Sequence, residues 1–117
     1  MEYRLLGRTG VRVSRLCFGT MSFGGDADET ESAGMYRACR DAGINFFDCA
    51  DQYNKGRAEE ILGQLMRGHR DELVITTKSF NPAGPDINAR GNSRRHVTRA
   101  VEASLKRLAT DRVDVFF

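Results

Sequence analysis

Three residues whose side chains can carry protons or charge follow two apolar segments of this sequence. Asp48 closes the apolar run 44–47, and Tyr53 follows five residues later, after a polar turn. Lys78 closes a second run, ELVITT, over residues 72–77. A phenol near an ammonium group and a carboxylate suits a reaction in which an oxygen atom gains negative charge and takes up a proton.

Each of these residues also has an ordinary structural explanation when it is taken alone. An Asp at a strand end is most often a turn or cap residue, a Tyr after it usually packs at a rim, and a Lys that ends a strand is usually solvated. Their joint appearance in this spacing favours the functional interpretation. We therefore treat Asp48, Tyr53 and Lys78 as candidate catalytic residues.

The elements that must position these residues are strands alternating with helices. The apolar spacing predicts one helix over residues 28–42 and a second that begins after Gly56. Ser93 is expected to cap a third helix, whose apolar face continues to Leu108. Strands are predicted over 44–47, 72–77 and 113–117. Residues 79–92 form a long loop that holds both prolines, and loops of this length are usually functional or disordered.

The amino-terminal part of the chain predicts a short hairpin. Its arms are two β-prone segments, residues 3–7 and 11–18, separated by a turn at 8–10. We expect the second arm to lead into a buried strand at Leu16, Cys17 and Phe18. The loop GTMSFGG follows, and glycines at a strand end allow the backbone to approach a ligand closely, although an ordinary turn would look the same.

This order of elements, a hairpin and then βαβαβαβ, implies a parallel α/β sheet with right-handed crossovers. Four strands could form the N-terminal half of a (β/α)₈ TIM barrel or a small doubly wound sheet, and periodicity does not separate the two. In a barrel, polar residues from successive strand ends gather around one axis. The positions of Gly19 and Thr20, Asp48 and Lys78, each at such an end, favour the barrel.

Composition limits the classes of function. The chain has 117 residues, of which 40% are hydrophobic and 29% charged, and this suits a single globular domain. A net charge of +2 is too small to indicate a nucleic acid or an anionic membrane as a partner. No apolar run approaches the roughly 20 residues of a membrane span, and the first residues lack the apolar core of a signal peptide. We expect a cytoplasmic location.

The residues that commonly bind metals or phosphates show no pattern of that kind. The three cysteines, Cys17, Cys39 and Cys49, form no CxxC pair and have no His at ligand spacing, so we expect reduced thiols and no metal site. His69 and His96 are expected at the surface. Arginines at 90, 94, 95 and 99 could indicate phosphate or nucleic acid, but we favour a solvated helix face because no aromatic residues are interleaved.

Taken together, the motifs resemble those of the aldo-keto reductase family. The matching segments cover nearly the whole chain in the order and spacing of the family; they read YRLLGRTGVRVSRLCFGTMSFGG, GINFFDCADQYNKGRAEEILGQ, VITTK and SRRHVTRAVEASLKRLATDRVDVFF. The resemblance implies a (β/α)₈ barrel that binds NADPH without a Rossmann motif and reduces small aldehydes or ketones to alcohols. In agreement, no GxGxxG follows a strand in this chain.

The resemblance also assigns individual residues. The Asp of the family's DTADxY motif falls on Asp48, its Tyr on Tyr53, and the Lys that closes its third barrel strand on Lys78. Gly19, Thr20 and Met21 match the first-strand loop near the cofactor, so with Asp48 they are the expected cofactor-binding residues. Cys49 stands where the motif commonly has Thr and Ala58 where it commonly has Ser, and neither position has a catalytic role.

The resemblance and the chemistry together predict a role for each candidate. An unperturbed tyrosine, with a pKa of about 10, gives up its proton reluctantly at neutral pH. A lysine ammonium nearby favours the phenolate, and an aspartate beside the lysine keeps that ammonium charged and oriented. Tyr53 would be the general acid, Lys78 the group that tunes it, and Asp48 the partner of Lys78. The family's fourth catalytic residue, a His after the fourth strand, matches neither His69 nor His96.

We expect residues 1–117 to form a single incomplete domain. A (β/α)₈ barrel typically has about 250 residues, and four strands leave open edges and an apolar interior facing water. The chain alone is therefore expected to be unstable, to self-associate, or to depend on a partner half. Phe23, Tyr53 and the loop over 80–92 are expected to line one wall of the substrate pocket.

Two functions of different classes remain open at this point. The first is an NADPH-dependent reductase of a small carbonyl substrate, with Tyr53 as the proton donor. The second is a non-catalytic module, either inactive or a nucleotide-sensing regulatory subunit of the kind related to channel β-subunits. A third interpretation, an unrelated half-barrel that binds a phosphorylated ligand, requires the spacing of Asp, Tyr and Lys to be a coincidence.

Overall fold

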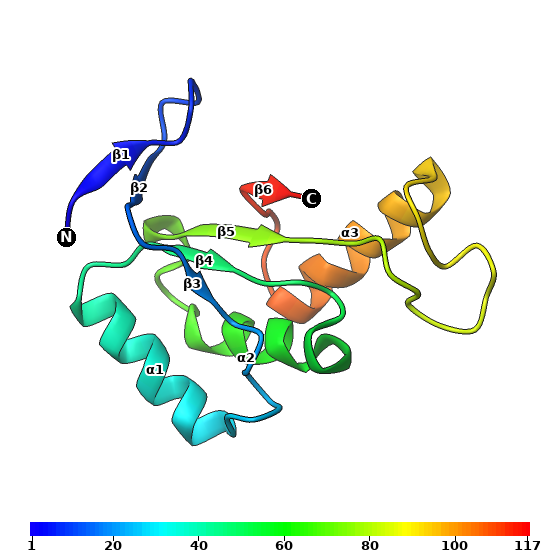
Figure 1. The fold of residues 1–117 in the computed structure, drawn as a ribbon, viewed down its shortest axis with the longest axis horizontal. Helices are drawn as coiled ribbons and strands as arrows, with labels where there is room; N and C mark the ends of the chain where they lie inside the picture. Colours follow the sequence, from blue (N-terminus) through cyan, green and yellow to red (C-terminus); the bar gives the residue numbers. More distant parts are fainter.

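A computed structural model describes all 117 residues, which form a hairpin, a four-stranded sheet and three α-helices (Figure 1). The hairpin strands β1 (Tyr3–Leu5) and β2 (Arg12–Ser14) pair antiparallel, with Arg4 opposite Val13. Gly7 and Gly10 in the connecting turn have φ angles of 56° and 80°, a region in which a residue without a Cβ is favoured. The predicted hairpin is confirmed.

The four strands of the sheet lie side by side in the order in which they occur in the sequence. They are β3 (Phe18–Gly19), β4 (Phe46–Asp48), β5 (Val74–Thr77) and β6 (Val115–Phe116), and all pairs are parallel. A doubly wound sheet reverses its strand order at one point, whereas a barrel adds each new strand on the same side. The fold is therefore the N-terminal half of a (β/α)₈ barrel preceded by a short hairpin, as predicted.

One helix connects each strand of the sheet to the next. These helices are α1 (Glu29–Asp41), α2 (Arg57–Leu65) and α3 (Arg94–Leu108), and α1 and α2 lie along the same side of the sheet in Figure 1. Asp28 and Glu31 form a capping box at the start of α1, and the Ser93 side chain accepts a hydrogen bond from the backbone of His96. Short 3₁₀ turns, η1 (Tyr53–Gly56) and η2 (Arg70–Glu72), precede α2 and β5.

The core lies between the sheet and the helices. Phe47 of β4 and Ile75 of β5 are fully buried there. The apolar residues predicted on one face of α2 pack in this core, and so does Leu108 of α3. No helix of the structure combines the length and the apolar character that a membrane crossing requires.

For several residues the predicted burial or exposure of the side chain is wrong. Leu16 is 60% exposed and Cys17 is also exposed, because the chain is still crossing from the hairpin to β3, which is an edge strand with one neighbour. Phe23 is completely buried in the core, 5.9 Å from Phe18 between ring centroids, so it does not line a pocket wall. His96 was expected at the surface and is only 4% exposed, because it lies one turn before Ala100 on the buried face of α3.

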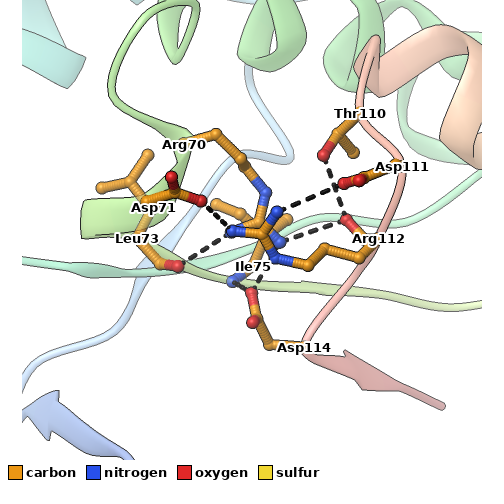
Figure 2. A network of polar contacts seen from close by, with 8 residues as sticks. All are labelled: Arg70, Asp71, Leu73, Ile75, Thr110, Asp111, Arg112 and Asp114. Carbon is orange, nitrogen blue, oxygen red and sulfur yellow. Dashed lines mark hydrogen bonds and ion pairs between the residues drawn. The ribbon is translucent and has the colours of Figure 1, made fainter.

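A polar network ties β6 to the start of β5 (Figure 2). The Asp114 carboxylate accepts hydrogen bonds from the backbone N–H of Ile75 at 2.7 Å and from the Arg70 guanidinium at 2.7 Å. The same guanidinium donates to the carbonyl groups of Leu73 and Arg112, at 2.9 and 3.1 Å. These contacts join segments about 40 residues apart in the sequence, so they help to hold the last strand in register.

Asp114→Ala is expected to lower the free energy of unfolding by about 2–4 kcal/mol, because it removes the carboxylate partner of a largely buried guanidinium and leaves a backbone N–H of β5 without its acceptor. Urea denaturation followed by circular dichroism measures this loss. Asp111→Ala is the matched control, since its 86% exposed carboxylate contacts only Arg112 and its removal should change stability by less than about 0.5 kcal/mol. Equal effects of the two substitutions would show that the network does not stabilise the sheet.

Candidate active site

The three candidate catalytic residues lie together at the carboxyl ends of β4 and β5. The Lys78 ammonium donates hydrogen bonds to both carboxylate oxygens of Asp48, at 2.7 and 2.6 Å, and to the hydroxyl of Tyr53 at 3.3 Å. A further hydrogen bond, to the backbone carbonyl of Cys49 at 2.6 Å, fixes the end of the lysine side chain. One ammonium therefore contacts both of the other groups, which is the geometry that the sequence interpretation required.

A residue that the sequence analysis missed holds Asp48 in place. The hydroxyl of Thr76, which is 1% exposed, donates to an Asp48 carboxylate oxygen at 2.5 Å. The two residues are direct partners in the pairing of β4 with β5, and Thr76 lies two residues before Lys78, which directly follows β5. The alternation along β5 was a usable signal, but the register that places Thr76 beside Asp48 was not available from the sequence.

Tyr53 is held at the start of η1, a turn with unusual backbone angles. The next two residues, Asn54 and Lys55, have φ angles of 50° and 57°, a left-handed conformation that non-glycine residues seldom adopt. The Asn54 side chain donates to the carbonyl oxygens of Met21 and Phe23, at 2.9 and 2.8 Å. These bonds stabilise the turn and tie it to the loop after β3, a role that no sequence motif had suggested.

The charges at the site favour a protonated lysine. Partial burial alone lowers the pKa of Lys78, but its hydrogen bonds to Asp48 and Tyr53, together with the charge of Asp48, raise that pKa above its ordinary value. Lys78 is therefore charged at neutral pH, and it loses its charge when the pH rises through this raised pKa. The ammonium also lies 5.0 Å from the centroid of the Tyr53 ring, so the tyrosine has a fixed positive charge beside it.

The predicted cofactor-binding residues lie at the same end of the sheet, with different exposures. Gly19 is exposed and has open space beside it, since an added Cβ would meet no atom within 4 Å. Met21 is 68% exposed. Thr20 is completely buried, and its hydroxyl and backbone N–H both donate to the carbonyl of Asp48, at 3.0 and 2.9 Å. Thr20 therefore positions the end of β4, while Gly19 and Met21 are accessible.

The cysteines near the site are poor nucleophiles. Burial raises the pKa of Cys49 to about 12, and partial desolvation of the Cys17 thiol, followed by the negative charge of Asp48, raises the pKa of that thiol to about 11. At pH 8 the thiolate fraction of Cys17 is thus about a hundredfold below that of a thiol with the ordinary pKa of 9.0. A reduced, packed thiol at Cys49 agrees with the sequence interpretation, whereas Cys17 is exposed rather than packed.

Iodoacetamide at pH 8 is therefore expected to modify Cys17 slowly and Cys49 only after unfolding. Mass spectrometry of peptides from native and urea-treated protein, sampled over time, measures both rates. A Cys17→Ser variant serves as the control, because it should leave the native protein nearly unreactive. Rapid modification of Cys49 in the folded protein would instead indicate an activated, redox-sensitive thiol.

The sequence of this chain is similar to sequences of known proteins. The sequence model described as "Aldo/keto reductase family" matches residues 15–117. A probable voltage-gated potassium channel subunit beta from Oryza sativa subsp. japonica is 48% identical over 121 residues, covering 100% of this chain and 37% of that protein. An uncharacterized oxidoreductase, YrpG, from Bacillus subtilis is 43% identical over 128 residues, covering 99% of this chain and 39% of that protein.

Solved structures show the same similarity in three dimensions. The holo form of the aldo-keto reductase AKR11C1 from Bacillus halodurans superposes with a TM-score of 0.86 at 35% sequence identity. That match covers 99% of this chain and 39% of the other. The chain thus spans about two fifths of the length of the relatives that it matches.

Proposed function

Because this chain belongs to the aldo/keto reductase family, we propose that the protein is an oxidoreductase that reduces a small aldehyde or ketone to an alcohol with NADPH. The observation that carries the proposal is the Lys78 ammonium, which bonds to both the Asp48 carboxylate and the Tyr53 hydroxyl. The assignment of residues 1–117 to a single barrel-type domain and a cytoplasmic location belong to the same proposal.

In this reaction the residues of the chain supply and control a proton. As negative charge develops on the carbonyl oxygen, the Tyr53 hydroxyl donates its proton to that oxygen, and the O–H bond of the tyrosine breaks. The Lys78 ammonium then stabilises the phenolate, and Asp48 keeps the ammonium in place. In the direction of alcohol oxidation, the tyrosine would accept the proton instead.

The residues present fit a nicotinamide cofactor at the open end of the sheet. When bound, NADPH supplies the hydride that adds to the carbonyl carbon. The open space beside Gly19 allows a flat ring to approach the backbone, and Met21 is exposed next to it. Asp48 is the partner of Gly19 in the sheet and so lies beside the same space. Thr20 would act by holding the end of β4 in place rather than by contacting the cofactor. The holo form of one structural relative supports such a cofactor.

A nucleotide-sensing regulatory subunit is the second candidate function. Its support is the 48% identity with a protein named as a probable channel β-subunit. Such a protein would bind the nucleotide through the same residues, and it would not need to catalyse carbonyl reduction rapidly.

The experiment that separates the two functions measures NADPH binding and carbonyl reduction in the native protein and in Tyr53→Phe. Reduction that is lost in the variant, with binding retained, supports the enzyme. Binding without reduction in both proteins supports the regulatory subunit, and the absence of both contradicts the proposal.

A further inference from the structure

A cavity of about 580 Å³ lies beside the candidate active site and includes none of Asp48, Tyr53 and Lys78 in its lining. Three parts of the chain form its walls: the segment after β4 (51, 52 and 55), the loop after β5 (82–84, 88 and 89), and one face of α3. In Figure 1 the long loop after β5 extends beside α3 at one end of the molecule. The proposed reductase chemistry makes no use of this cavity.

The wall of the cavity contains a buried polar group without a partner. His96 is 4% exposed, and its Nε2 atom has no hydrogen-bond partner. The cap at the start of α3 uses the backbone N–H of His96, which donates to the Ser93 hydroxyl at 3.1 Å, and does not involve the imidazole. Buried side-chain nitrogens nearly always have a hydrogen-bond partner in folded proteins. The unpaired imidazole in a cavity wall therefore indicates a ligand that would complete its bonding.

The charges around the cavity indicate the sign of that ligand. Lys55 and Arg99 line it without a salt-bridge partner, whereas the charge of Arg107 is balanced by Glu59 at 2.6 Å. The amino end of α3, a helix of 15 residues, adds a partial positive charge nearby. Two cations without a salt-bridge partner and one carboxylate, that of Asp51, therefore line the cavity.

Asp51 is the one feature of the lining that opposes an anion. It is 8% exposed, and burial followed by the charge of Glu59 raises its pKa above the ordinary value. Its carboxyl group is therefore more easily protonated than that of an exposed aspartate, and in the protonated form it can donate a hydrogen bond. At neutral pH the Asp51 carboxyl group weakens the attraction of the cavity for an anion but does not reverse it.

We propose that this cavity is a binding site for a small oxyanion, a phosphate or carboxylate group, which Lys55 and Arg99 attract and to which His96 supplies a hydrogen bond. Arg90, Arg94, Arg95 and Arg99 are all exposed, in agreement with the expected solvated face, and Arg99 is the member of that group that also lines the cavity. The inference does not depend on the proposed carbonyl reduction.

The test follows the imidazole resonances of the protein by NMR during titration with inorganic phosphate at constant pH and ionic strength. His69 is an internal reference, since its Nε2 is bonded to the Tyr36 hydroxyl at 2.6 Å. Phosphate is expected to shift the His96 resonances in a saturable manner and to leave those of His69 unchanged. A second titration with malonate distinguishes a carboxylate site from a phosphate site.

Two exposed arginines of α3 provide matched variants. Arg99→Gln is expected to raise the dissociation constant for phosphate about tenfold or more. The side chain of Arg95 does not line the cavity, so Arg95→Gln should leave that constant unchanged. Asp51→Asn should tighten binding because it removes the opposing charge. The proposal is overturned if neither anion shifts His96 in a saturable manner, or if the two arginine variants weaken binding equally.

Discussion

Tyr53→Phe is expected to lower kcat for carbonyl reduction by about 10²- to 10⁴-fold, the usual contribution of a positioned proton donor. The substitution removes the hydroxyl that Lys78 contacts at 3.3 Å and keeps the ring beside the ammonium. Since the ion pair of Lys78 with Asp48 does not depend on that hydroxyl, the fold and the NADPH affinity should be retained. Steady-state kinetics and a fluorescence titration with NADPH measure the two quantities.

Tyr3→Phe is the matched control for this prediction, because it makes the same chemical change in the hairpin. The Tyr3 hydroxyl donates to the carbonyl of Gly43, which lies before the amino end of β4, whereas Asp48 lies at the carboxyl end of that strand. The kcat of the Tyr3→Phe variant should stay within about twofold of the native value, as expected for a substitution outside the reacting group. Retention of native kcat in Tyr53→Phe would exclude the tyrosine as the proton donor.

Arg107→Leu is expected to lower the free energy of unfolding by about 3–5 kcal/mol, the typical effect of leaving a buried charge without its partner. Glu59 on α2 is completely buried, and its carboxylate accepts hydrogen bonds from Arg107 at 2.6 Å and from the Thr77 hydroxyl at 2.5 Å. Without the guanidinium, the carboxylate would remain buried beside one hydroxyl. Thermal or urea unfolding followed by circular dichroism measures the loss.

Two comparisons make this result specific to the buried pair. Lys106→Leu changes the neighbouring residue of α3, which is exposed and has no ion pair, so it should alter stability by less than about 0.5 kcal/mol. In the background Glu59→Gln, the further change Arg107→Leu should cost much less than it does in the native protein, because no buried negative charge remains. A loss below about 1 kcal/mol in the single variant would mean that the pair contributes little.

Local patterns in the sequence were sufficient for the identity and order of the elements. The spacing of apolar residues predicted the bounds of α1 to within one residue and the start of α2 after Gly56, and the capping role of Ser93 is confirmed. The same patterns placed Asp48 and Lys78 at the ends of neighbouring strands. These features depend on residues close together in the chain, and for that reason they can be inferred from the sequence alone.

Contacts between distant segments decided the rest. Periodicity allowed either a barrel or a doubly wound sheet, the residues at the strand ends favoured the barrel, and the order β3–β4–β5–β6 excluded the doubly wound sheet. The position of Thr76 beside Asp48 depends on the register between strands 28 residues apart, and the burial of His96 depends on what packs over the first turn of α3. Periodicity determines which face of an element is apolar, but the segment that covers a given side chain is determined only when the elements assemble.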